Sequence, residues 1–227
     1  LESQGFKNIC DVDILNSGDK VYFNNRKKSI FAAVIGKSKL EEGVNIVGAH
    51  IDSPRLDLKP NPIYEDAKLA LFKTHYYGGI KKYQWTTIPL ALHGVIVKTN
   101  GEKIEVNIGE DMDDPIFTIT DILPHLSQRQ NEKKITEAIE GEGLNLLIGS
   151  IPGDEKENPV KSNVLKLLNE KYGIVEADFL SSEIELVPAF KARSLGFDES
   201  MVAAYGQDDK VCSFASLLFC IIPLLSN

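Results

Sequence analysis

Apolar and polar positions alternate in short runs along much of the chain, a pattern typical of β-strands. Strands are predicted over residues 29–35, 44–49, 68–77, 144–150, 183–188 and 200–205. Two further apolar runs, 88–98 and 103–108, flank Asn100-Gly101, which is a strong signal for a tight hairpin. The middle of the chain is therefore expected to be rich in β-structure.

Prolines interrupt the pattern over residues 52–66, at Pro54, Pro60 and Pro62. Because proline cannot donate to a strand ladder or continue a helix, a loop is predicted there. Such a loop follows the predicted strand 44–49, and loops of this kind often carry functional residues.

Helical spacing is clearest over residues 159–173, where apolar side chains recur on one face at Val160, Val164, Leu167 and Leu168. Helix-compatible patterns also cover 119–128 and 130–140, and an apolar final helix is expected to begin near Asp209. The apolar run within it, 214–225, is shorter than the roughly 18 residues that span a bilayer, so no membrane span is expected.

The composition is that of an ordinary globular protein, with 227 residues, 43% apolar and 26% charged. Acidic residues outnumber basic ones by 33 to 25 and no basic cluster stands out, so a nucleic acid partner is not expected. Three cysteines and no recognisable signal peptide favour a reducing compartment, the cytoplasm. The apolar segment that stops at Asn227 has no following element to pack against, so the chain is expected to be incomplete.

A histidine and a carboxylate stand two residues apart in Gly48-Ala49-His50-Ile51-Asp52, where the predicted strand meets the loop. At this spacing both side chains share one face of a strand. One ring nitrogen of His50 is then free to bind a metal while Asp52 holds the other ring N–H and fixes the tautomer. The alternative is an ordinary strand-end histidine beside a local Asx turn.

A second acidic site follows in Gly206-Gln207-Asp208-Asp209-Lys210, at the start of the predicted final helix. One aspartate can cap the helix, which is the ordinary interpretation. The adjacent carboxylate repels it unless a cation is bound, so a metal is a natural partner for the pair.

In combination these stretches resemble the aspartyl-aminopeptidase-type metallopeptidases, cytosolic enzymes with two zinc ions. The matching motifs occur in family order, at 48–56, 76–79, 122–126 and 206–211. The resemblance implies that His50 ligates one metal, that Asp52 supports His50, and that Asp208 bridges both metals. It also implies a cis peptide bond between Asp208 and Asp209, and a role for His125 in the active site of a neighbouring subunit.

The family's Glu-Glu pair, which supplies the general base and a ligand, is not visible in this sequence, and neither are its last ligands. His75 and His93 lack an acidic partner at ligand spacing, so both are expected to be structural or surface residues.

The fold class predicted is α/β, with a catalytic domain formed by residues 1–88 and 186–227. A β-rich insertion, 89–185, interrupts it, and such an insertion mediates dimerisation in the resembled family.

The expected function is metal-dependent removal of N-terminal residues from peptide substrates by a homo-oligomer built from dimers. In the resembled family the residues removed are acidic. Zinc is the expected metal, with cobalt or manganese also compatible with the ligand types. Two alternatives remain open: a non-catalytic assembly module that keeps the fold, and a related metal-dependent deacylase.

Overall fold

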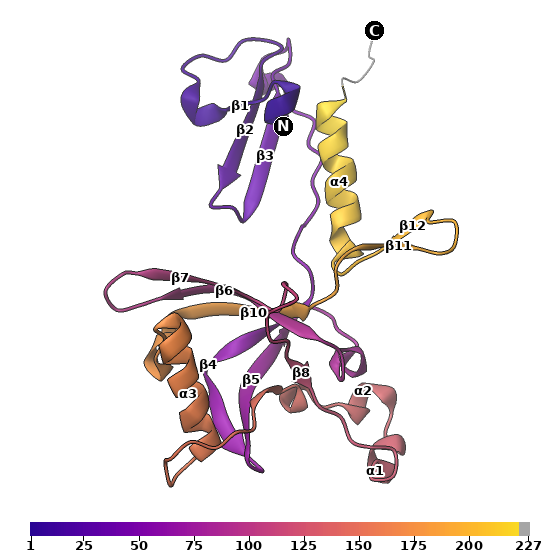
Figure 1. Ribbon diagram of the computed structural model, residues 1–227. Helices are drawn as coiled ribbons and strands as arrows, with labels where there is room; N and C mark the ends of the chain where they lie inside the picture. The colour runs from indigo at the N-terminus through magenta and orange to yellow at the C-terminus, as the bar shows by residue number, and fades with distance from the viewer. Residues whose placement is uncertain (223–227) are drawn as a thin grey trace. The chain divides into compact units, whose positions relative to one another are not determined.

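The computed structural model describes residues 1–222, which form two compact units (Figure 1). The first unit combines the N-terminal residues up to Ser53 with the segment that begins at Gly206, and the second runs from Pro54 to Tyr205. The sequence predicted domain boundaries near residues 88 and 186, and the compact units change at other positions. The strand that follows Pro54 pairs with the strand at 182–188, so both segments belong to one sheet.

The second unit is built on a seven-stranded sheet with the order β7-β6-β10-β4-β5-β9-β8, in which all neighbours are antiparallel. Its strands are β4 (Arg55–Asp66), β5 (Leu69–Tyr77), β6 (Leu90–Val97), β7 (Lys103–Ile108), β8 (Thr118–Ile119), β9 (Leu146–Gly149) and β10 (Ser182–Pro188). The predicted hairpin is confirmed, since β6 and β7 pair from Leu92 opposite Ile108 to Val97 opposite Lys103. A separate two-stranded sheet joins β11 (Arg193–Leu195) to β12 (Met201–Ala203).

Strand β4 corrects the prediction of a loop over residues 52–66. Its ladder to β5 is regular from Arg55 to Leu58 and resumes only at Ile63. Pro60 and Pro62 lie in this interval, where a missing amide N–H breaks no ladder hydrogen bond. The prolines therefore mark an irregularity within a strand rather than its absence.

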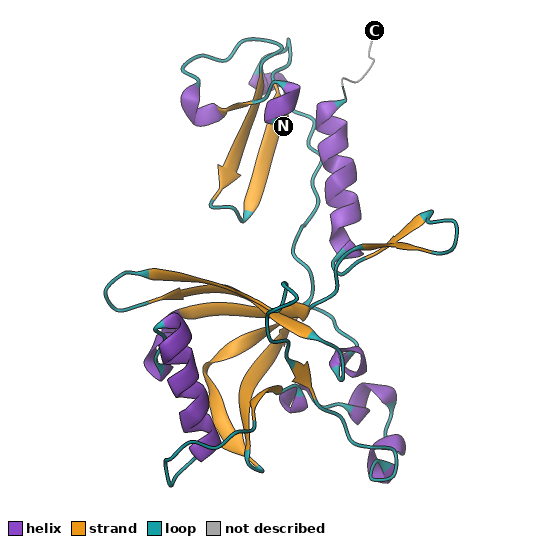
Figure 2. Ribbon diagram, viewed as in Figure 1, coloured by secondary structure: helices purple, strands orange, loops and turns teal. Residues whose placement is uncertain are grey.

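Helix α3 (Pro159–Tyr172) lies against the sheet and confirms the clearest helical prediction (Figure 2). Val160 and Val164 are buried against Ala70 of β5. The Glu65 carboxylate at the end of β4 accepts hydrogen bonds from the first helical amides, at 2.8 Å from Val160 and 3.0 Å from Lys161. A carboxylate at a helix N-terminus is favoured by the helix dipole, so the sheet both covers and caps this helix.

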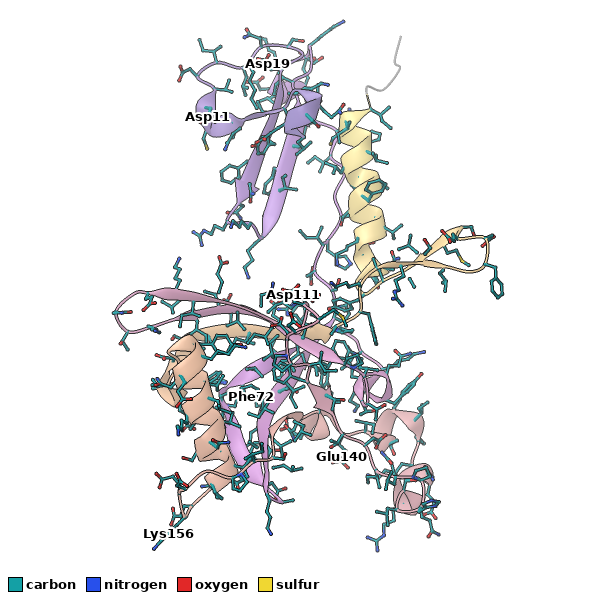
Figure 3. The ribbon with its side chains drawn as sticks, in the orientation of Figure 1. Asp11, Asp19, Phe72, Asp111, Glu140 and Lys156 are labelled. Carbon is teal, nitrogen blue, oxygen red and sulfur yellow. The ribbon has the colours of Figure 1, made fainter. Side chains whose placement is uncertain are left out.

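The core of the second unit lies on this face of the sheet, where Phe72 of β5, labelled in Figure 3, meets Phe179 edge to face at a centroid distance of 5.5 Å. Its largest fully buried side chains are Leu56, Leu90, Ile96, Ile119, Leu144, Leu146 and Leu186. Most of these residues belong to the apolar runs from which strands were predicted.

The helices predicted over 119–128 and 130–140 shrink to single turns, α1 (Gln128–Asn131) and α2 (Ile135–Ala138). Pro124 interrupts the first pattern, and its apolar members Ile122, Leu123 and Leu126 are exposed rather than packed. Short 3₁₀ helices complete the unit: η4 (Lys82–Trp85), η5 (Gly141–Gly143) and η6 (Glu176–Ser181).

The first unit contains a small sheet and the final helix. Its strands are β1 (Lys7–Asn8), β2 (Lys20–Asn25) and β3 (Ser29–Val34), and its helices are η1 (Glu2–Gln4), η2 (Ile9–Asp11), η3 (Leu40–Glu42) and α4 (Gln207–Ile221). The predicted final helix is thus confirmed as far as Ile221, while the end of its apolar run lies outside the described residues. Within residues 1–222, no helix has the length and apolar character needed to cross a membrane.

Residues 44–53 have no regular secondary structure, which corrects the strand predicted over 44–49. The apolar side chains of this stretch point into solvent, with Ile46 at 84% exposure and Val44 at 62%. A strand is stable only beside a hydrogen-bonding neighbour, and within residues 1–222 none pairs with this segment. An apolar run in the sequence does not by itself supply such a neighbour.

Candidate metal centre

His50 lies in the irregular segment of the first unit and faces the start of α4, 158 positions later in the chain at Asp208. Its Nε2 atom is 3.6 Å from Asp208 Oδ1 and 3.7 Å from Asp209 Oδ2. Its other ring nitrogen, Nδ1, is 3.3 Å from Asp52 Oδ1. The structure therefore brings together His50, Asp52 and Asp208, the three residues of this unit that the sequence selected.

The hydrogen bonds of the ring settle which nitrogen of His50 carries the proton. Nδ1 is 3.1 Å from the backbone carbonyl oxygen of Asp52, and a carbonyl can only accept. Nδ1 therefore donates its hydrogen to Asp52. The lone pair of the neutral imidazole then lies on Nε2, the nitrogen that faces Asp208.

The two adjacent aspartates have different local roles. Asp209 is 16% exposed, and its Oδ1 accepts a hydrogen bond of 3.2 Å from the Cys212 amide, as a helix-capping side chain does. Asp208 is 87% exposed. The backbone at both residues departs from helical angles, and the peptide bond between them is cis, as the resemblance implied. Asp209 is thus used by the helix, whereas the carboxylate of Asp208 is open to a ligand.

The surroundings of His50 also bear on its charge. Desolvation lowers the pKa of His50, but the hydrogen bond to the Asp52 carbonyl and the charges of Asp209 and Asp52 outweigh it and raise the pKa above its ordinary value. The same carboxylates that favour a proton on this imidazole also favour a metal cation beside it.

The imidazole nitrogen of His50 and the carboxylate oxygen of Asp208 are donors of the types that zinc binds. Two donors bound at 2.0 to 2.2 Å in a tetrahedral arrangement lie about 3.4 Å apart, close to the 3.6 Å between His50 Nε2 and Asp208 Oδ1. No cluster of three or more His, Cys, Asp or Glu side chains within residues 1–222 can hold a metal ion. Within the described residues, the structure therefore brings together two candidate ligands, His50 and Asp208, and not a complete site.

The other histidines belong to the second unit. His125 is exposed on the turn after Pro124, and its side chain makes no hydrogen bond or ion pair with the residues that the structure describes. His75 stacks on Tyr76. His93 bonds Glu110 at 2.9 Å across the β6–β7 hairpin, an acidic partner that spacing along the sequence did not reveal.

Two serines of the site were missed by sequence reasoning. Ser53 Oγ donates to the carbonyl oxygen of Asp208 at 3.2 Å, and Ser213 Oγ donates to the carbonyl oxygen of His50 at 2.7 Å. Ser213 lies one helical turn after Asp209 in a mostly apolar stretch, but Ser216 of the same stretch is polar as well, so the signal for Ser213 is weak. Ser53 carries no comparable signal.

Comparison with known proteins gives a consistent result over nearly the whole chain. Residues 1–223 match the family described as aminopeptidase I zinc metalloprotease (M18). A probable M18 family aminopeptidase 1 from Clostridium acetobutylicum is 58% identical over 222 residues, covering 95% of this chain and 48% of the relative. The chain thus spans about half the length of the curated relatives that it matches.

Comparison with solved structures gives the same family. The crystal structure of an M18 aminopeptidase from Thermotoga maritima superposes with a TM-score of 0.89 at 51% identity, covering 97% of this chain and 48% of that one. The S. cerevisiae mApe1 dodecamer superposes with a TM-score of 0.61 over 90% of this chain and 45% of that one. At 20% identity the yeast likeness shows a shared fold and nothing more.

Proposed function

Because the chain belongs to the aminopeptidase I zinc metalloprotease family (M18), we propose that the gene product containing it is a zinc-dependent aminopeptidase. The observation that carries the proposal is the pairing of His50 Nε2, whose lone pair is free, with the open carboxylate of Asp208 at 3.6 Å. The activity is assigned to a protein of the relatives' length, since this chain covers 48% of the C. acetobutylicum enzyme.

In this proposal His50 and Asp208 bind zinc, and Asp52 holds the His50 ring in the tautomer that binds it. When bound, zinc polarises the carbonyl of the scissile peptide bond and lowers the pKa of water toward neutrality. Asp209 keeps the first turn of α4 in place beneath Asp208. Two zinc ions are proposed, and Asp208 would be a ligand of both. Cobalt or manganese are the alternatives that oxygen and imidazole donors permit.

We further propose that the protein is a homo-oligomer built from dimers in which His125 approaches the metal site of a neighbouring subunit. The exposed position of His125 and the lack of an intramolecular partner within residues 1–222 support this, since the imidazole is available. The β-rich insertion over residues 89–185 is proposed to mediate dimerisation. The yeast protein solved as a dodecamer shows that a protein of this fold assembles.

The cytoplasm is the proposed location, supported by three cysteines that are all unpaired.

Metal removal tests the reaction. We expect dialysis of the whole gene product against a chelator to abolish hydrolysis of aminoacyl-arylamides, and zinc, cobalt or manganese to restore it, because metal polarisation supplies several kcal/mol of the barrier reduction. Aspartyl, glutamyl and leucyl arylamides compared side by side show whether acidic residues are preferred.

N-acyl amino acids serve as the control substrates. Metal-dependent cleavage of these compounds, with arylamides untouched, would identify a deacylase and overturn the proposal. Failure of both substrate classes in metal-loaded, assembled protein would support the non-catalytic module instead.

A further inference from the structure

Two hydroxyl groups connect the segment that carries His50 to the helix start that carries Asp208. Ser213, on the second turn of α4, donates to the backbone carbonyl of His50 at 2.7 Å. Ser53, three residues after His50, donates to the backbone carbonyl of Asp208 at 3.2 Å. Each segment thus supplies one serine that binds the backbone of the proposed metal ligand on the other segment.

The backbone at the start of α4 leaves room for the hydroxyl of Ser53. Gly206, at the N-terminus of α4, has a φ of +77°, which favours glycine. A Cβ added there would lie 2.5 Å from Lys210 Nζ and 2.9 Å from Ser53 Oγ. The glycine therefore leaves room for both side chains beside the helix start.

The need for such bonds follows from the secondary structure. Residues 44–53 form neither helix nor strand, so no ladder of hydrogen bonds fixes the position of His50. Asp208 lies in a turn with non-helical angles before the regular part of α4. A zinc site tolerates errors of only a few tenths of an ångström between its donors, so both segments must be held relative to each other.

We propose that Ser53 and Ser213 form a reciprocal clamp that positions His50 and Asp208 for zinc before the metal binds. They are positioning residues and touch neither metal nor substrate. The inference rests on the proposed function, because it assumes that His50 and Asp208 are the ligands.

An ordinary explanation exists for one of the two serines. Ser213 Oγ also lies 2.9 Å from the carbonyl oxygen of Asp209, four residues earlier, and helical serines commonly bond that carbonyl. A hydroxyl has one hydrogen to donate, and the contact with His50 is the shorter at 2.7 Å. If the bond within the helix were the important one, removing the hydroxyl would leave zinc binding unchanged.

The test measures zinc affinity, by competition with a chromogenic chelator, in the whole gene product carrying Ser53→Ala, Ser213→Ala or both. Ser216→Ala is the matched control, because Ser216 lies on the same helix and its hydroxyl makes no hydrogen bond with the described residues. We expect each single variant to bind zinc about 10-fold more weakly, in the range for groups that orient a ligand. In the double variant, the fold-loss of zinc affinity should exceed the product of the fold-losses in the two single variants, because either bond alone still joins the two segments.

Further readouts separate positioning from loss of folding. The visible spectrum of the cobalt-substituted protein should change in both single variants and stay as in wild type for Ser216→Ala, because it reports ligand geometry. Ser53→Thr and Ser213→Thr keep the hydroxyl and should restore zinc affinity. Metal-free variants should show the far-UV circular dichroism of wild type.

The outcomes distinguish the clamp from the function that it serves. Zinc affinities within about twofold of the Ser216→Ala control in both single variants would overturn the clamp, provided that His50→Ala loses zinc. Unchanged zinc affinity in His50→Ala would overturn the proposed metal site itself.

Discussion

Replacing His50 with alanine is expected to weaken zinc binding by the whole gene product more than about 100-fold, beyond the range for groups that only orient a ligand, and to abolish the proposed aminopeptidase activity. The imidazole offers a free lone pair on Nε2, 3.6 Å from Asp208 Oδ1, and no other histidine of residues 1–222 approaches Asp208 within ion-pair distance. Zinc content by atomic emission and arylamide hydrolysis measure the two effects.

Two variants sharpen this prediction. Asp52→Asn keeps the size of the side chain and the backbone carbonyl that accepts from Nδ1, so the loss of zinc affinity should be smaller, about 10- to 100-fold. His75→Ala is the control, because it removes an exposed imidazole that stacks on Tyr76 in the second unit. Wild-type activity of His50→Ala at trace zinc would refute the ligand assignment.

Replacing His125 with alanine should lower kcat by about 100-fold, the effect of removing one donor that stabilises developing negative charge. Zinc content and assembly should stay as in wild type. The reason is that His125 is exposed on a turn and supports no described hydrogen bond, so its removal leaves the fold intact. Steady-state kinetics together with light scattering measure both properties.

The proposed sharing of sites between subunits has a direct consequence for mixtures. Subunits carrying His125→Ala and subunits carrying His50→Ala should regain activity when they assemble together, because one mixed pair contains an intact metal site faced by an intact His125. A mixture that stays inactive although both variants co-assemble would contradict the shared site. So would a monomeric protein at micromolar concentration that is fully active.

Local patterns predicted the parts of the molecule whose partners lie close in sequence. The β6–β7 hairpin follows from Asn100-Gly101, and α3 follows from the spacing of Val160 and Val164 with Gly173 just beyond its end. His50 and Asp52 were identified because their spacing of two residues fits a ligand and its orienting group. The likeness of four motifs to one family then connected them with Asp208.

The failures have two physical causes, the dependence of a segment on partners far away in the sequence and an irregular strand pairing. Apolar residues 44–49 predicted a strand, but a strand needs a neighbour that a sequence pattern does not reveal. Proline predicted a loop where β4 accommodates Pro60 and Pro62 at a register shift. Ser213 bonds a carbonyl 163 residues away, and no local pattern encodes that contact.

In the proposed metal site, His50 and Asp208 bind the same metal ion. A crystal structure of the zinc-loaded gene product, with anomalous diffraction recorded on both sides of the zinc edge, tests this assignment directly. We predict a zinc peak within bonding distance, about 2.0 to 2.2 Å, of both His50 Nε2 and an Asp208 carboxylate oxygen. Zinc bound at full occupancy with neither residue among its ligands would contradict the account.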